Sequence, residues 1–303
     1  MAIYKICKNK FQRVEYEGFK LEKEMQKFVE ENVQELFNLQ FLATEYTLNE
    51  YRFDTIAFDE ANNAFVIIEY KRGKNESLVD QGFAYLSTAL DRKAELVLLY
   101  NKVYQVGRDV KNFDWGATRV FFVSPQFTKY QKSAVGFQQM PFRLFEIKKY
   151  LGGLYSVDEI VTEKVQGGLK FGENNPTVQE VLEEVKVFTE EDHIEKLSEA
   201  MQEVYRSLRD RILEIGEIEI VPTKCYLAFK NENKNICDLE IYKSHITVFI
   251  NLPAGALNDP YQKARDISKI GHHGNGDYSV LIKTMDEIDY VLTLIRQSFE
   301  FNK

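Results

Sequence analysis

Residues 52–81 read RFDTIAFDEANNAFVIIEYKRGKNESLVDQ, and this stretch decides how the first half of the chain folds. Two apolar runs, 51–58 and 64–70, flank a polar turn, which is the pattern of a β-hairpin. Glu69 and Lys71 project from one face of the second strand, since successive side chains alternate between faces. Pairing brings Asp54 beside them. Buried charges are costly unless they are paired or bind a metal, so the stretch predicts a chemically active site.

Asp54, followed fifteen residues later by Glu69-Tyr70-Lys71, resembles the PD-(D/E)XK nuclease superfamily. It looks most like the subgroup that includes branched- and mismatched-DNA endonucleases. The flanking residues that complete the pattern are Arg52, Arg72 and a following helix that opens with Asp80 and Gln81 and carries Tyr85 one turn later. The resemblance covers roughly the first half of the chain, residues 1–156.

The resemblance implies a Mg²⁺-dependent endonuclease, with Mn²⁺ able to substitute, that hydrolyses DNA phosphodiester bonds in repair, restriction or phage defence. Asp54, Glu69 and the backbone carbonyl of Tyr70 would hold the metal through hard oxygen ligands. Lys71 would orient or help deprotonate the attacking water and stabilise developing charge. Gln81 would position the water, Lys71 or the phosphate.

A helix expected over 21–37 adds a further carboxylate, because in this superfamily a glutamate of the first helix often reaches the metal. Glu22 and Glu24 are the candidates, and Glu22 fits the family pattern better. The alternative is that both are solvated acids placed favourably near a helix N-terminus. The candidate phosphate contacts are Arg52, Arg72 and Lys74.

The net charge of −8 is unevenly spread along the chain. Residues 1–156 hold 22 Lys and Arg against 20 Asp and Glu, which leaves 17 against 27 for the rest. The first half can therefore present a basic groove to DNA, whereas the acidic second half does not attract phosphate. Three cysteines without a CxxC pair indicate neither a disulfide framework nor a zinc knuckle. There is no bilayer-length apolar run, and the N-terminus has no cleavage signal, so we expect a cytoplasmic protein without a membrane partner.

Alternating strands and helices predict an α/β domain over 1–156 with a layered sheet of mixed pairing. The resemblance implies that this is a restriction-endonuclease-like mixed sheet flanked by helices. The further strands expected there are 41–47, 96–100, 119–124 and 142–150, and the further helices are 79–89 and 129–135. A glycine-rich stretch marks a linker with a short helix at 157–189. A smaller α+β domain follows at 190–303, with a long helix (193–215), a three-stranded meander (225–229, 236–242 and 245–251) and a terminal helix (285–299).

The second domain is similar to an uncharacterised C-terminal domain often fused to such nucleases, through LNDP at 257–260 and GHHGNGD at 271–277. The latter cluster has the residue types of a metal site or a phosphate cradle. Its Gly, Asn and Asp content is also ordinary for a turn, and we favour that interpretation.

Two alternatives to catalysis stay open at this point. Taken singly, Glu69 and Lys71 are also explained by an ion pair, and Asp54 by a turn residue. One alternative is a non-catalytic nucleic-acid-binding module with a nuclease-like fold. The other is a sensor whose second domain binds a ligand or a protein partner. A homodimer would suit cleavage of both strands of a duplex.

Overall fold

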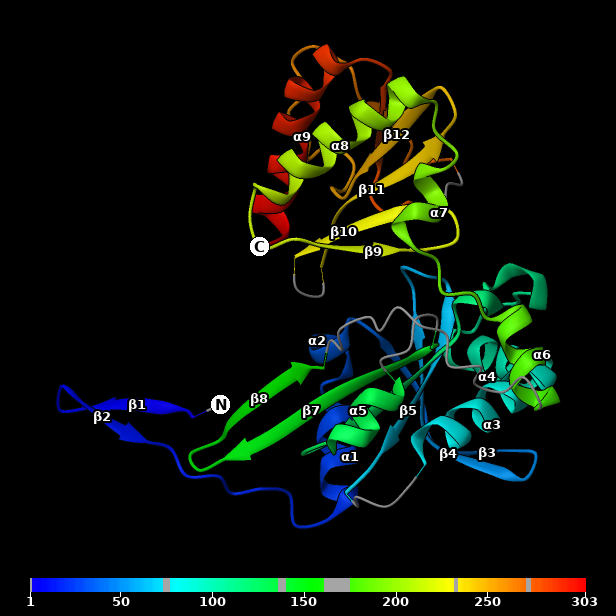
Figure 1. The fold of residues 1–303 in the computed structure, drawn as a ribbon, viewed down its shortest axis with the longest axis vertical. Helices are drawn as coiled ribbons and strands as arrows, with labels where there is room; N and C mark the ends of the chain where they lie inside the picture. The colour runs from blue at the N-terminus through cyan, green and yellow to red at the C-terminus, as the bar shows by residue number, and fades with distance from the viewer. Residues whose placement is uncertain (1, 73–76, 136–139, 161–174, 232–233, 271–273) are drawn as a thin grey trace. The chain divides into compact units, whose positions relative to one another are not determined.

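The computed structural model describes residues 2–72, 77–135, 140–160, 175–231, 234–270 and 274–303. The chain forms two compact units, Met1–Lys186 and Val187–Lys303, and each has its own sheet and core (Figure 1). The predicted fold class is confirmed: a mixed sheet flanked by helices, and a second α+β unit. Within the described ranges, no helix combines the length and apolar character needed to cross a membrane.

The first unit is built on a six-stranded sheet with the order β3-β4-β5-β6-β7-β8. Its strands are β3 (Gln40–Leu48), β4 (Tyr51–Asp59), β5 (Ala64–Tyr70), β6 (Arg119–Ser124), β7 (Phe142–Tyr150) and β8 (Leu154–Glu159). β3, β4 and β5 pair antiparallel, β5, β6 and β7 pair parallel, and β8 is antiparallel to β7. All seven residues of β5 are buried, as expected for a continuous apolar run covered on both faces.

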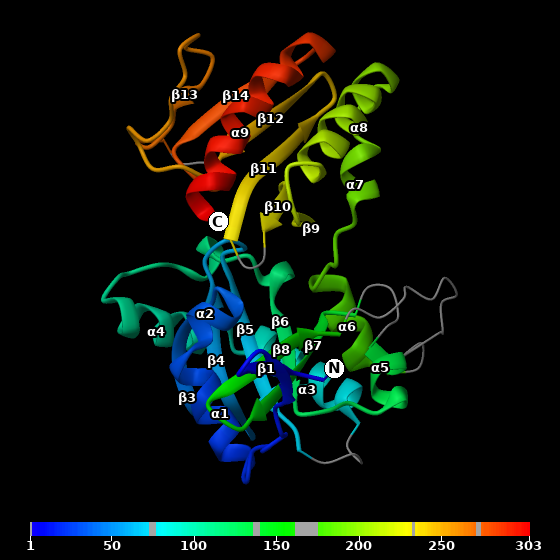
Figure 2. The same cartoon turned by 90° about the vertical axis from the view of Figure 1, so that its left-hand side faces the viewer.

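Helices cover both faces of this sheet (Figures 1 and 2). One core joins α1 (Glu22–Glu31) and α2 (Val33–Phe37) to one face, and it contains Val66, Ile68 and Tyr70. The other core contains Phe65 and Ile67. Its helices are α3 (Leu78–Asp91), α4 (Lys93–Tyr104), α5 (Lys129–Val135) and α6 (Pro176–Glu184). Strand alternation therefore sends Glu69 and Lys71 to the face that α3 covers.

The strand predicted at 96–100 is wrong, because these residues lie within α4. Leu96, Val97 and Tyr100 are buried, whereas Leu98 is exposed, so the buried side chains follow helical spacing. A short apolar run does not distinguish a strand from a helix by itself. The helix predicted over 21–37 is real but interrupted, because Asn32 separates α1 from α2.

A small hairpin precedes the sheet in the chain, and we call it the arm (residues 2–14). Its strands are β1 (Tyr4–Cys7) and β2 (Lys10–Arg13), and all eight of their residues are exposed. The base of the arm closes through a 2.8 Å hydrogen bond from Val14 N–H to the Ile3 carbonyl. Figure 1 shows β1 and β2 extending past the end of β7 and β8.

The second unit contains a six-stranded antiparallel sheet rather than the predicted three-stranded meander. Its order is β13-β14-β12-β11-β10-β9, with β9 (Glu219–Pro222), β10 (Leu227–Asn231), β11 (Lys234–Tyr242), β12 (His245–Ile250), β13 (Arg265–Asp266) and β14 (Tyr278–Ile282). The meander forms its centre, and the short flanking strands lack an alternating pattern long enough to show in the sequence.

Two long helices of the second unit, α8 (Glu199–Leu213) and α9 (Ile288–Asn302), pack on one side of this sheet (Figure 2). The helix predicted over 193–215 is divided, because α7 (Glu190–Ile194) ends before Ser198 caps α8. β8 runs across residue 156, where we expect the first domain to end, and α6 of the expected linker packs in the first unit's core. Residues 161–174 of that linker lie outside the described residues.

Candidate functional site

The hairpin of β4 and β5 brings two carboxylates together at its open end. The last paired residues are Thr55 and Ile68, so Asp54 lies one step further, opposite Glu69. Asp54 Oδ2 accepts a 3.1 Å hydrogen bond from the N–H of Tyr70. This contact fixes the Asp54 carboxylate at the end of β5, between the two residues of the Glu-x-Lys pattern.

Glu69 is buried, and three groups of the sheet and α3 surround it. Lys71 Nζ lies 3.0 Å from Glu69 Oε1, and Gln81 Nε2 donates to the same oxygen at 2.9 Å. Gln81 Nε2 also lies 2.8 Å from the Tyr85 hydroxyl. Gln81 and Tyr85 share one face of α3 because they are four residues apart. The structure thus brings Asp54, Glu69, Lys71 and Gln81 into one cluster.

Burial governs the protonation of this cluster. It raises the pKa of Glu69 to about 7, with the Asp54 charge as the second cause and Lys71 as a partial offset. Burial likewise raises the pKa of Asp54, although the Tyr70 N–H and Lys71 lower it in part. Two carboxylates that share one ammonium are short of positive charge, so a further cation would stabilise their ionised forms.

The oxygens of Glu69 differ in a way that tests the fit of a metal ion. Oε1 receives both Lys71 and Gln81, whereas Oε2 is buried and has no hydrogen-bond partner among the described residues. Within those residues, no group of three or more His, Cys, Asp or Glu side chains is arranged to hold a metal. Mg²⁺ commonly uses one or two carboxylates and completes its shell with water and substrate phosphate. Asp54 and Glu69 fit that requirement.

On the first helix, the residue that contacts Asp54 is Gln26, whereas the sequence predicts that Glu22 or Glu24 reaches the metal. Gln26 donates a 3.0 Å hydrogen bond to the Asp54 carbonyl, and Glu30 accepts one of 2.6 Å from Thr55. Glu24 is 2.8 Å from Lys149 Nζ and accepts a 2.8 Å hydrogen bond from the Lys20 N–H. Glu22 is exposed and lies one turn before Gln26. Gln26 lies one turn after Glu22, so helical spacing could have placed it on the same face. An amide side chain, however, gives no signal for a metal site.

The predicted phosphate contacts occupy different places. Arg52 is exposed and pairs with Glu45 at 3.2 Å. Arg72 is exposed, donates to the Lys20 carbonyl, and lines a cavity of about 940 Å³. Lys74 lies outside the described residues. Other residues around this cavity are Arg13, Tyr16, Gln126, Lys148 and Tyr150.

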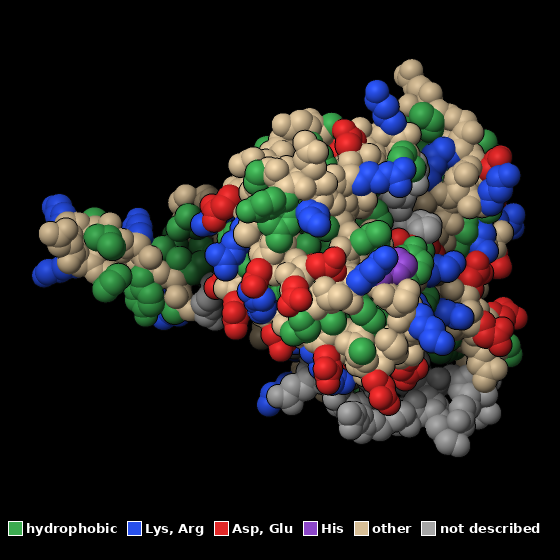
Figure 3. All heavy atoms as spheres, turned by 90° about the horizontal axis from the view of Figure 1, so that it is seen from above, with side chains coloured by type: hydrophobic (Ala, Val, Ile, Leu, Met, Phe, Trp, Pro, Cys, Tyr) green, Lys and Arg blue, Asp and Glu red, His purple; other side chains and the backbone are tan. Residues whose placement is uncertain are grey.

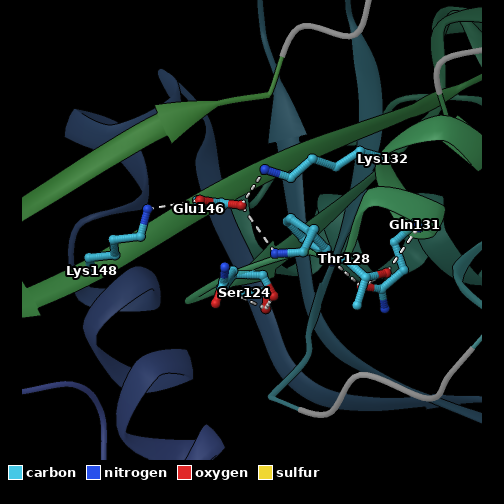
Figure 4. Close-up of polar contacts among 8 residues, drawn as sticks. Ser124, Thr128, Gln131, Lys132, Glu146 and Lys148 are labelled. Carbon is cyan, nitrogen blue, oxygen red and sulfur yellow. Dashed lines mark hydrogen bonds and ion pairs between the residues drawn. The ribbon is translucent and has the colours of Figure 1, made fainter. Parts of the chain in front are cut away.

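A second polar cluster, not predicted from the sequence, lies on β7 (Figure 4). Glu146 is buried, and both of its oxygens are occupied: Lys132 Nζ at 2.7 Å and the Phe127 N–H at 3.1 Å reach Oε1, and Lys148 Nζ at 2.8 Å reaches Oε2. Burial alone would raise the pKa of Glu146, but these partners lower it to about 2. The signal was present, since Glu146-Ile147-Lys148 repeats the Glu-x-Lys pattern after an apolar run.

The second unit has its own buried carboxylate, Asp238 on β11. Burial raises its pKa to about 7, although the N–H and side chain of Asn275 donate to it at 2.6 and 2.8 Å. Asn235 Nδ2 donates to its other oxygen at 2.8 Å. These contacts hold residues 274–277 of the predicted GHHGNGD cluster against the sheet, which is the behaviour of a structural turn. Residues 271–273, with both of its histidines, lie outside the described residues.

Three solved structures are similar to parts of this chain at low TM-scores. A repair endonuclease from Pyrococcus abyssi is 21% identical, with 39% of this chain and 44% of that chain covered at a TM-score of 0.22. EndoMS in a complex with double-stranded DNA is 21% identical, with 41% and 45% covered at 0.22. SfsA of Pyrococcus furiosus with Ca²⁺ is 12% identical, with 54% and 77% covered at 0.26. TM-scores in this range carry no argument about fold or activity.

The sequence comparisons are stronger. Residues 190–302 match the family model described as Domain of unknown function (DUF5655). A protein of Haemophilus influenzae, described as "Uncharacterized protein", is 36% identical over 302 residues, which cover 99% of this chain and 100% of that protein. The chain therefore belongs to the same family as this Haemophilus influenzae protein, and the similarity extends over almost its whole length.

Proposed function

We propose that the first unit is a Mg²⁺-dependent endonuclease of the PD-(D/E)XK type, which hydrolyses DNA phosphodiester bonds. The observation that carries this proposal is the state of Glu69. One of its oxygens is buried beside the carboxylate of Asp54 and has no hydrogen-bond partner in the described part of the chain, while the other oxygen accepts a hydrogen bond from Lys71 Nζ at 3.0 Å. A purely structural ion pair has no need for a second, half-buried carboxylate, which weakens it electrostatically.

Asp54 and Glu69 would hold the metal, with the Tyr70 carbonyl as a third donor. Glu22 or Glu24 would supply an additional oxygen, and Glu22 is preferred because its position fits the family pattern better. When bound, Mg²⁺ polarises the scissile phosphate and lowers the pKa of a bound water, and Mn²⁺ supplies the same chemistry.

The remaining residues act on the phosphate and the attacking water. Lys71 keeps its ammonium beside Glu69, where it would orient the water and stabilise the charge that develops on the phosphate oxygens. Gln81 is held by Glu69 and the Tyr85 hydroxyl, and it would position the attacking water, Lys71 or the phosphate. Arg72, Arg52 and Lys74 are the proposed contacts to phosphates on either side of the cut.

A non-catalytic nucleic-acid-binding module is the second candidate. This candidate would be favoured if Lys71 pointed away from the carboxylates, because DNA binding alone does not require an ammonium group beside a metal site. Lys71 Nζ instead lies 3.0 Å from Glu69 and is buried. This arrangement supports the catalytic proposal over the binding one. A ligand or protein partner of the second unit and a homodimer remain proposals.

The proposal is tested with labelled single-stranded, duplex, flap and mismatched DNA in Mg²⁺, Mn²⁺ or EDTA. Glu69→Ala and Lys71→Ala are compared with Glu146→Ala, which alters the equivalent glutamate on β7. Metal-dependent cutting that is lost only in the first pair of variants supports the proposal and identifies the substrate class. Binding without cutting under every condition contradicts it.

A further inference from the structure

The arm (residues 2–14) has a composition unlike the rest of the chain. It carries Lys5, Lys8, Lys10 and Arg13 and no Asp or Glu, although the whole protein has a net charge of −8. Among the described residues, no ion pair involves any of these four cations. Figure 3 shows Lys and Arg side chains together with hydrophobic side chains along this projection. The arm is therefore a concentrated, unneutralised positive charge.

The hairpin register divides the arm into two different faces. Ile6 pairs with Phe11 and Tyr4 with Arg13, so one face is mainly apolar, and Ile6 and Phe11 are 73% and 80% exposed. Cys7 pairs with Lys10 and Lys5 with Gln12, so the other face is polar and basic. Lys8 and Asn9 form the tight turn, with φ values of 49° and 62°.

An exposed two-stranded hairpin is at best marginally stable in water on its own. The arm buries none of its strand residues against the first unit, and it leaves a phenylalanine and an isoleucine in solvent. These features indicate a surface that is completed by a partner. The charge limits which partner that is: two identical arms that paired with each other would bring like charges together, whereas a polyanion would neutralise them.

The arm joins the first unit beside the end of β7, where Tyr16 forms a β-bridge with Tyr150. Leu151 N–H donates to the Glu15 carbonyl at 2.9 Å, and the Tyr16 and Tyr150 rings contact edge to face at 5.9 Å. These contacts attach the base of the arm to the end of β7. Arg13 lines the 940 Å³ cavity together with Arg72, the residue that follows Lys71. Glu15 and Glu17 also line this cavity, and Glu17 is paired with Lys149 at 3.1 Å. A strand of nucleic acid in the cavity would run between Arg13 of the arm and Arg72.

We propose that the arm is a DNA-binding β-ribbon that lies in a groove of duplex DNA and delivers the duplex to Asp54 and Glu69. The major groove of B-DNA accommodates a two-stranded β-ribbon, and the four cations of the arm would pair with the phosphates that border the groove. The exposed apolar face then packs against base edges and sugars rather than water. This inference rests on the proposed nuclease function for its substrate, but its own test is binding.

The test measures affinity for a fluorescent 20-base-pair duplex in EDTA across a series of KCl concentrations. We compare the wild-type protein with Lys5→Ser/Lys10→Ser and with the matched control Lys102→Ser/Lys111→Ser, in which both lysines are also exposed. Losing two phosphate contacts lowers the slope of log K against log salt by about 2. Lys5→Arg/Lys10→Arg keeps the charge and should restore the slope. An unchanged slope in the Ser variant, or an equal change in the control, overturns the proposal.

A second measurement does not depend on the stability of a variant. Cys7 is exposed on the basic face of the arm, so a photoreactive maleimide attached there reports what the arm contacts. We expect crosslinks to the duplex that disappear in Cys7→Ser. Crosslinks between two protein chains in the presence of duplex would overturn the proposal in favour of a second copy as the partner.

The two proposals fail in different ways. If the wild-type protein cuts DNA but the arm variant keeps its salt slope, the arm proposal is wrong and the nuclease proposal stands. If duplex is bound through the arm but never cut, the arm proposal stands and the nuclease proposal is wrong. A protein that does not bind duplex at any salt concentration contradicts the arm proposal outright.

Discussion

The Glu69 and Lys71 pair at the end of β5 has a counterpart two strands away, in Glu146 and Lys148 on β7. Both pairs follow an apolar run on the sheet face that α3 and α5 cover. Glu69 lies near the carboxyl end of β5, and Glu146 lies where the parallel pairing of β7 with β6 ends. Both glutamates are buried to the same extent, at 5% exposure. Their pKa values nevertheless shift in opposite directions, to about 7 for Glu69 and about 2 for Glu146.

The difference comes from neighbours that the two motifs do not contain. Glu146 receives two ammonium groups and a backbone N–H, so its negative charge is fully compensated (Figure 4). Glu69 has one ammonium group and a second carboxylate, and one of its oxygens has no partner among the described residues. A compensated carboxylate stabilises the fold, whereas an undercompensated one attracts a cation. We therefore assign a structural role to Glu146 and Lys148 on β7 and propose that the metal site lies at Glu69, at the end of β5.

The largest expected contrast is in DNA cleavage. Glu69→Gln removes the charge that would hold the metal, and a loss of several kcal/mol of transition-state stabilisation lowers the single-turnover rate by about 10²–10³-fold. Glu146→Gln should change that rate by less than about tenfold, because it touches neither Asp54 nor Glu69. Equal losses in two folded variants would show that the two pairs share one function.

Stabilisation by Mg²⁺ should distinguish the Glu69 pair from the Glu146 pair without an activity assay. Mg²⁺ at about 100 times its dissociation constant raises the free energy of unfolding by about 2.7 kcal/mol. We expect this gain in the wild-type protein and in Glu146→Gln but not in Glu69→Gln. The single tryptophan, Trp115, is buried in the core of the first unit, so its fluorescence in a urea titration reports that unit. Persistence of the gain in Glu69→Gln would place the metal elsewhere.

Substitutions in the metal-free protein should have opposite signs at the two sites. Glu146→Gln leaves Lys132 and Lys148 without a charged partner and should destabilise the first unit by about 1–3 kcal/mol. Asp54→Asn removes one of two repelling carboxylates and keeps an acceptor for the Tyr70 N–H. We expect it to be neutral or to stabilise the unit by up to about 1 kcal/mol at pH 8. Urea denaturation in EDTA measures both, and a strongly destabilised Asp54→Asn would contradict the proposed repulsion.

The smallest effect is a difference in pH dependence. The pKa of Glu69 is raised from 4.5 to about 7, so the folded state holds its proton longer than the unfolded state, and stability falls as pH rises from 4.5 through 7. The pKa of Glu146 is lowered from 4.5 to about 2, so its contribution is present above 4.5 and is lost as pH falls toward 2. Each group changes the free energy of unfolding by at most about 1.4 kcal/mol per pH unit within its range. In EDTA, Glu69→Gln should flatten only the upper range and Glu146→Gln only the lower.

Sequence patterns predicted the elements that are long and strongly periodic. The hairpin of β4 and β5, the helix that carries Gln81 and Tyr85, and the mixed sheet all follow from local spacing. The apolar run at 96–100 does not distinguish a strand from a helix by itself, and its burial on one side of α4 is seen only in the fold. The outer strands of the second unit were missed, because short strands depend on pairing with distant neighbours rather than on their own residues.

The sequence by itself determined which residues have the chemistry for a site, and strand alternation placed Glu69 and Lys71 on one face. Two of its Glu-x-Lys patterns, 69–71 and 146–148, follow apolar runs in the first half of the chain. The expected hairpin already brings Asp54 beside Glu69, whereas only the tertiary structure brings Lys132 and the Phe127 N–H to Glu146 and so compensates its charge. The physical reason is that Coulomb energies in a buried environment depend on distances through space, and these are set by packing between segments far apart in the chain.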